Sequence, residues 1–192
     1  MSIPPTDSVD RLPFLTTGKT VSWRSSEIEK QVIALFEQFR NSLLRYVLAF
    51  GLSVQDGEEV AQEVFLALFR HMTMGRPRQN LRGWIFSVAH NLALKQRQSN
   101  RRLPDRNGSA GMVAENKPDP SLNPEEQVLS KERQARLLAS VDALPEQDRC
   151  CLYLRAEGLR YREISYALGI SLGAVSLSLT RSLTRLMGAY DR

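Results

Sequence analysis

The stretch that decides the fold is Tyr161-Arg-Glu-Ile-Ser-Tyr-Ala-Leu-Gly-Ile-Ser-Leu-Gly-Ala-Val-Ser-Leu-Ser-Leu-Thr-Arg181. Its apolar spacing predicts a short helix over Tyr161–Leu168, a turn over 169–171 and a longer helix over Leu172–Met187. Gly169 supplies the permissive backbone that the turn needs, and the Ser171 hydroxyl can cap the second helix. The residues that would fill the angle between the helices are Ile164, Leu168, Ile170, Val175, Leu179 and Leu186. The pattern predicts a helix-turn-helix, whose second helix enters the DNA major groove, although an ordinary helical hairpin would show the same spacing.

Two further helices are predicted immediately before this motif. The first follows Glu125 and stops at Pro145, and the second runs from Glu146 to Glu157, where Gly158 closes it. We therefore expect a C-terminal helical domain over 125–192.

The N-terminal half shows three more helical periods. The first begins at Glu27 and ends at Gly51 and Ser53, the second follows Asp56, and the third covers Leu81–Gln98. Short turns between them predict a compact three-helix domain over 27–98. Residues 1–26 contain three prolines and no sustained period, and we expect a loose N-terminal arm there. Residues 99–124 are polar and interrupted by Pro and Gly, which predicts a linker. The fold class is therefore all-α, with two small helical domains.

Composition narrows the class of protein. The chain has 192 residues, 42% of them hydrophobic, and a net charge of +5, which fits a polyanionic partner without proving one. We expect no membrane insertion, no secretory signal and a cytoplasmic location, because no apolar run approaches the length of a membrane span. We also expect no catalytic site, cofactor or metal: no phosphate-cradling glycine loop or metal-ligand cluster is present, and His71 and His90 stand alone on helices. Cys150 and Cys151 are interpreted as packing residues, with redox sensing as the alternative.

Several motifs resemble those of the extracytoplasmic-function (ECF) sigma factors, which direct RNA polymerase to promoters. Ala143-Leu-Pro-Glu-Gln-Asp-Arg149, Leu154-Arg-Ala-Glu-Gly-Leu-Arg-Tyr-Arg-Glu-Ile164 and Leu168-Gly-Ile-Ser-Leu-Gly-Ala-Val175 resemble region 4, which reads the −35 element. Glu58-Glu-Val-Ala-Gln-Glu-Val-Phe-Leu-Ala-Leu-Phe69 resembles region 2.2. Leu81-Arg-Gly-Trp-Ile-Phe-Ser-Val-Ala-His-Asn-Leu-Ala93 resembles regions 2.3 and 2.4, which melt and hold the −10 element. The resemblance covers residues 27–100 and 125–188.

The resemblance implies a set of partners and contacts. The partners would be core RNA polymerase, promoter DNA and an anti-sigma factor. Polymerase docking, onto the clamp coiled coil of the largest subunit, would involve Glu59, Gln62 and Glu63. Contacts to the −10 element would come from Arg82, Asn91, Lys95 and Arg97, with a base pocket built by the loop between Thr73 and Arg82. Contacts to the −35 element would come from Arg155, Tyr161, Arg162, Ser176, Leu177, Thr180 and Arg181.

The predicted recognition helix departs from its relatives at two positions. Many relatives carry Lys or Arg where this chain has Ser176 and Ser178, so Arg181 would be its one outward cation in the first three turns. Arg181 could pair bidentately with a guanine or hold a phosphate, and the shortage of other donors favours base reading. Leu177 could contact thymine methyl groups.

Two other functions compete with a promoter-specificity subunit. A free-standing helix-turn-helix regulator would leave the motifs of the N-terminal domain unexplained. A thiol oxidoreductase using Cys150 and Cys151 would lack the Cys-x-x-Cys spacing of such enzymes.

Overall fold

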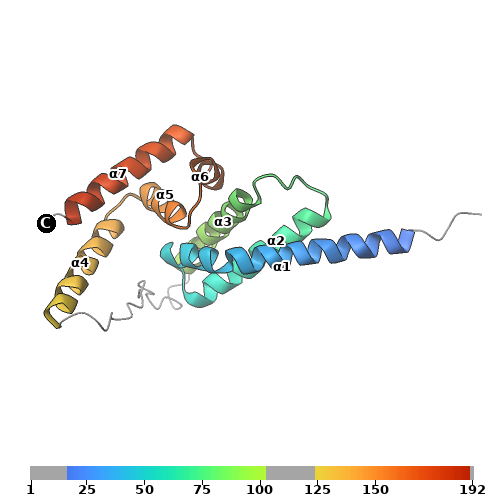
Figure 1. The fold of residues 1–192 in the computed structure, drawn as a ribbon, viewed down its shortest axis with the longest axis horizontal. Helices are drawn as coiled ribbons and strands as arrows, with labels where there is room; N and C mark the ends of the chain where they lie inside the picture. The colour runs from blue at the N-terminus through green and yellow to red at the C-terminus, as the bar shows by residue number, and fades with distance from the viewer. Residues whose placement is uncertain (1–16, 103–123, 191–192) are drawn as a thin grey trace, which may run out of the picture.

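The computed structural model describes residues 17–102 and 124–190, with side chains over 26–102 and 131–188. Within these ranges the chain forms seven α-helices and no strand (Figure 1). Their bounds are α1 Thr17–Ala49, α2 Val54–Thr73, α3 Leu81–Arg102, α4 Pro124–Asp142, α5 Glu146–Ala156, α6 Tyr161–Leu168 and α7 Leu172–Tyr190. The all-α prediction is confirmed.

Helices α1, α2 and α3 pack into the first domain. Its fully buried side chains include Leu43, Val47, Val64, Leu68, Ile85 and Phe86. Gly57 lies where α2 crosses α1, and a Cβ built there would stand 3.3 Å from Cγ2 of Val47, so a larger side chain would crowd Val47. The apolar stripe seen in the sequence is the face that builds this core.

The second domain contains the predicted helix-turn-helix. Helices α6 and α7 meet at a bend of 105°, which is within the usual range for the motif. Gly169 has a φ of 66°, a left-handed conformation that favours glycine. The Ser171 hydroxyl accepts a hydrogen bond from the backbone N–H of Ala174 at 3.1 Å. The expected turn chemistry is therefore confirmed at both residues.

Several helix boundaries differ from those expected. Helix α1 begins at Thr17 rather than Glu27, so the last part of the expected loose arm is helical. No proline follows Pro13 in this part of the chain, and lengthening an existing helix adds a hydrogen bond for each residue ordered. Ser53 does not end α1 but caps α2, where its hydroxyl accepts from the Asp56 N–H at 3.1 Å. Helix α3 continues to Arg102, and Arg101 and Arg102 in its last turn suit the negative end of the helix dipole. Residues 103–123 of the expected linker lie outside the described residues.

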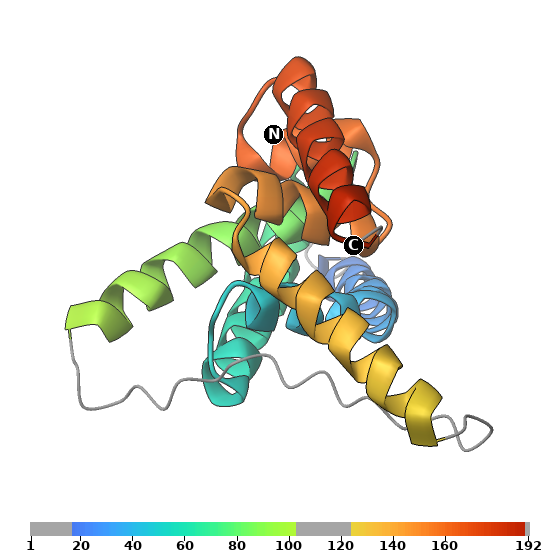
Figure 2. The same ribbon diagram turned by 90° about the vertical axis from the view of Figure 1, so that its left-hand side faces the viewer.

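The two domains pack against each other. Helices α5 and α6 lie beside α3 and the C-terminal part of α1 (Figures 1 and 2). The Arg45 guanidinium of α1 donates to both carboxylate oxygens of Glu157, at 2.8 and 2.6 Å. The buried apolar side chains of both domains form one continuous cluster. In these ranges no single helix is long and apolar enough to cross a membrane; α6 and α7 reach that length and composition only when the bent pair is taken together.

Candidate nucleic-acid interface

The exposed face of α7 carries the side chains predicted to meet DNA bases. Ser176, Leu177 and Thr180 are exposed, Leu177 by 55%. Val175 and Leu179 are buried on the opposite face, as the apolar spacing predicted. Ser178, one of the two positions where relatives often carry a cation, is fully buried. A cation at that position would enter the core of this domain, so only the Ser176 difference changes the exposed surface.

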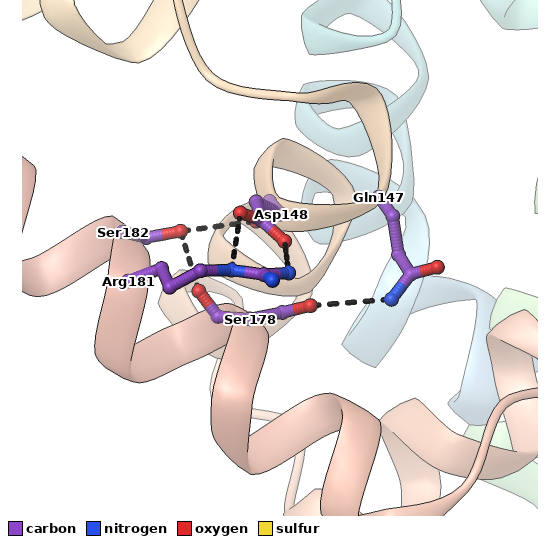
Figure 3. Close-up of polar contacts among 5 residues, drawn as sticks. All are labelled: Gln147, Asp148, Ser178, Arg181 and Ser182. Carbon is purple, nitrogen blue, oxygen red and sulfur yellow. Dashed lines mark hydrogen bonds and ion pairs between the residues drawn. The ribbon is translucent and has the colours of Figure 1, made fainter.

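Beside this face, a polar cluster ties α7 to the start of α5 (Figure 3). The Asp148 carboxylate accepts from Nε of Arg181 at 3.1 Å and from an Nη of Arg181 at 2.7 Å. Gln147 donates to the Ser178 hydroxyl at 3.2 Å, and the Ser182 hydroxyl donates to the Ser178 carbonyl at 2.8 Å. The Asp148 carboxylate is 1% exposed, whereas the Arg181 side chain is 49% exposed.

Burial alone would raise the pKa of Asp148. The hydrogen bonds from Arg181 and Ser178 outweigh it, and the net pKa lies below its ordinary value. Asp148 is therefore ionised at neutral pH, and the ion pair is present when the protein meets its partners.

This cluster changes the interpretation of Arg181. From the sequence, Arg181 was expected to be an outward cation free to pair with a guanine. In the structure, two of its nitrogens already bind Asp148. Nothing in the sequence pattern indicated this pairing, because an acidic residue in the first turn of a helix is explained by the helix dipole alone.

The other predicted −35 residues lie on α5 and α6. Tyr161 and Arg162 are exposed at the start of α6. Arg155 donates to the Leu159 carbonyl at 3.0 Å, and its guanidinium stands 5.9 Å from the centre of the Tyr161 ring. Arg155 therefore supports the turn before the helix-turn-helix while its side chain stays exposed.

The predicted −10 residues on α3 fall into two groups. Asn91 and Lys95 are exposed. Arg82 donates to the Glu157 carbonyl at 2.6 Å, and Arg97 pairs with Glu146 and covers the Phe50 ring at 4.4 Å. Arg82 and Arg97 are thus held by residues of the second domain, at the C-terminal cap and at the start of α5. The contacts join residues far apart in the chain, so no local pattern could have predicted them.

The aromatic residues of α3 are structural. Phe86 is fully buried and meets Tyr46 edge-on, with ring centres 6.0 Å apart. Trp84 is partly buried, and its ring centre is 4.6 Å from that of His71. His71 in turn binds the Pro77 carbonyl at 2.9 Å. Trp84 and His71 therefore anchor the loop between α2 and α3, while Phe86 is closed off from any nucleic acid.

The predicted polymerase-binding residues share one exposed face of α2. Glu59, Gln62 and Glu63 are all exposed and follow the three- and four-residue spacing of one helix face. Beside them, α1 and α2 form an apolar groove of about 550 Å³. The residues that line it include Val32, Ile33, Phe36, Phe65, Leu66 and Phe69, together with Gln62. The polar row was predicted from the sequence but the groove was not, because most of its apolar residues belong to the apolar stripes of α1 and α2.

The cysteine pair is buried between helices. Burial raises the pKa of Cys150 and of Cys151 to about 11 in each case. Both thiols are therefore protonated at neutral pH, and the thiolate is the reactive form. The interpretation of the pair as packing residues is confirmed by their burial. Among the described residues, no cluster of three or more His, Cys, Asp or Glu side chains could hold a metal ion.

We expect iodoacetamide to label these thiols slowly in the folded protein and fast in 6 M guanidinium chloride. We also expect Cys150→Ser/Cys151→Ser to leave the response of the protein to peroxide unchanged. Mass spectrometry of the labelled protein checks the first expectation, and transcription with and without peroxide checks the second. Rapid labelling in the native state, or a peroxide effect lost in the double variant, would establish a redox role.

Comparisons with known proteins agree with this architecture. The sigma-70 region 2 family matches residues 35–103, and the sigma-70 region 4 family matches residues 134–186. The ECF RNA polymerase sigma factor ShbA of Streptomyces griseus is 36% identical over 140 residues, which cover 70% of either chain. The sigma factor SigE of Mycolicibacterium smegmatis is 32% identical, and the match covers 73% of this chain and 55% of SigE.

Two solved structures show the same fold at low identity. Bartonella quintana RpoE, solved with the anti-sigma factor NepR, matches with a TM-score of 0.61 and 16% identity, over 84% of this chain and 98% of its own. CnrH, solved with the cytosolic domain of CnrY, matches with a TM-score of 0.57 and 19% identity, over 89% of this chain and 94% of its own. Domain order, helix-turn-helix and relatives agree: the chain belongs to the ECF family of RNA polymerase sigma factors. It is an alternative sigma factor that directs transcription initiation.

Proposed function

We propose that each domain carries a separate part of this activity, without catalysis by the chain itself. The first domain, over 27–98, binds core RNA polymerase and the −10 element, and the second, over 125–192, reads the −35 element. The observation that carries the proposal is that one chain combines an exposed recognition helix in its second domain with a first domain whose α2 offers a polar row beside an apolar groove. A protein that only bound duplex DNA would need the first of these features alone.

Core polymerase would bind along α2. Glu59, Gln62 and Glu63 would face a basic helical element of the polymerase, and apolar side chains of that element would enter the groove between α1 and α2. Charged residues at a rim and apolar residues at a centre are the usual division of a protein interface. This arrangement accounts for the exposure of Leu66 and Ile33, which are 45% and 56% exposed.

The −10 element would bind along α3 and the loop before it. Asn91 can pair with a base edge, and Lys95 can hold a phosphate. Arg82 and Arg97 would join them after exchanging their contacts with Glu157 and Glu146 for contacts with phosphate. Promoter binding by the first domain would therefore require the second domain to move.

The −35 element would meet α7 in the major groove. Leu177, Ser176 and Thr180 would face the bases or the adjoining backbone, and Arg155, Tyr161 and Arg162 would contact phosphates from α5 and α6. An anti-sigma factor is a further expected partner, since the Bartonella quintana sigma factor of this fold was solved with the anti-sigma factor NepR. The site of action would be the cytoplasm, where RNA polymerase works.

Run-off transcription tests the proposal. Purified chain, core polymerase and a template carrying the region upstream of its own gene should together yield a discrete transcript that neither protein produces alone. In a gel shift, the chain alone should bind duplex promoter DNA weakly and form a specific complex only with core polymerase. Tight, sequence-specific binding by the isolated chain would instead establish a free-standing regulator.

A further inference from the structure

We infer that Asp148 is a positioning residue, which fixes Arg181 as a phosphate-holding group at the edge of the recognition helix. The inference rests on the proposed function, and it concerns how the −35 element is contacted. Among the described residues of the second domain, Asp148 is the buried carboxylate, and it contacts the recognition helix (Figure 3).

The Arg181 guanidinium has five N–H donors. In this structure Nε and one Nη nitrogen donate to the two oxygens of Asp148, at 3.1 and 2.7 Å. The edge formed by the two Nη nitrogens keeps hydrogens that Asp148 does not take. The two-point contact with Asp148 therefore fixes the direction of that edge, and the position of Arg181 on α7 determines which DNA group the edge can meet.

Arg181 also has a defined position around the axis of α7. Residues of an α-helix follow one another at about 100°, so Arg181 stands about 40° from Leu177 and about 60° from Ser178 around the axis. Leu177 is 55% exposed and Ser178 is fully buried. Arg181 is therefore at the boundary between the exposed and the buried face, on the side next to α5. Side chains at this boundary meet the wall of the major groove, where the phosphates are, rather than its floor.

Releasing Arg181 from Asp148 is costly. Asp148 is 1% exposed, so water cannot replace Arg181 as its partner without a rearrangement of α5 and α7. Leaving a buried carboxylate without its cation is strongly unfavourable. Arg181 therefore meets DNA from the position at which Asp148 holds it.

The test measures binding of the holoenzyme to single-base variants of the −35 element of a promoter that it transcribes, at several salt concentrations. Arg181→Ala should weaken binding to every variant by the same factor, roughly tenfold for one lost charge-assisted hydrogen bond. The slope of log K against log salt should become shallower by about 1. A loss confined to one base pair would overturn the phosphate assignment.

Asp148→Asn keeps the shape of the side chain and removes its charge. It should also weaken binding uniformly, by less than Arg181→Ala, and should add nothing in the Arg181→Ala background. Removing a negative charge that does not act through Arg181 should instead strengthen binding to DNA, because it lowers the repulsion between the chain and the phosphates. Glu132→Gln, at an exposed residue of α4, is therefore the matched control. Tighter or unchanged binding by Asp148→Asn, or a loss that persists without Arg181, would show that Asp148 does not act through Arg181.

Two more variants keep the inference testable if Asp148→Asn does not fold, which its thermal melting curve will show. Arg181→Lys retains the charge but has no Nε–Nη edge, so it should bind between wild type and Arg181→Ala, again uniformly. Asp148→Glu retains the carboxylate and should bind nearer to wild type than Asp148→Asn. If Arg181→Lys bound DNA as well as wild type does, the two-point contact between Arg181 and Asp148 would not be needed for binding. Failure of the proposed function itself would look different, because wild-type holoenzyme would then give no transcript at all.

Discussion

Phe86→Ala should lower the free energy of unfolding by about 3–5 kcal/mol, which is the usual cost of emptying a buried phenylalanine site. Phe86 has no exposed surface, and it packs edge-on against Tyr46 of α1. The lost ring leaves a cavity between α1 and α3 that the helices cannot close without moving α3. Chemical denaturation followed by circular dichroism measures the change.

Met74→Ala is the matched control, because Met74 lies in the same domain but is 67% exposed. Its cost should stay within about 0.5 kcal/mol, as for most exposed substitutions. In transcription assays, Phe86→Ala should lose activity in parallel with its folded fraction and recover it at lower temperature. A Phe86→Ala protein that is as stable as wild type but fails to open promoters would instead indicate a base-stacking role for this ring.

Local features of the fold could be predicted from the sequence. The bounds of α6 coincide with the expected ones, as does the start of α7. Both follow from the short-range chemistry of Gly169 and Ser171, which fix the turn by a left-handed backbone and a capping hydroxyl. The start of α1 at Thr17 was missed because it lies beyond the apolar stripe. An apolar stripe reports where a helix is packed, not where it begins.

Contacts between distant residues could not be predicted. Arg45 and Glu157 are 112 positions apart in the chain. Taken singly in the sequence, neither residue differs from an ordinary charged surface residue. The same holds for Asp148 and Arg181, which are 33 positions apart. For the candidate site, the sequence therefore identified which side chains stand on each helix. It did not identify which of the cations are paired with other residues of the chain. Such pairing determines how a cation can contact DNA.

Glu59→Lys/Glu63→Lys should weaken binding of core polymerase by roughly a hundredfold or more, since like charges brought together at an interface cost several kcal/mol. The two carboxylates are one helical turn apart on the exposed face of α2, so both would meet the same basic surface of the polymerase. Because they are exposed, the melting temperature should change little. Fluorescence anisotropy of labelled sigma titrated with core polymerase measures the affinity.

The control for this variant must change the net charge equally without touching α2. Glu37→Lys/Glu132→Lys does so, because Glu37 is exposed on α1 and Glu132 is exposed on α4. If long-range electrostatics alone attracted the chain to the polymerase, both double variants would lose affinity to the same extent, and more so at low salt. A docking surface on α2 requires that the Glu59/Glu63 variant loses far more, and that the difference between the two variants persists when the salt concentration is raised. Equal losses would remove α2 from the polymerase interface and leave the groove between α1 and α2 as a surface for some other partner.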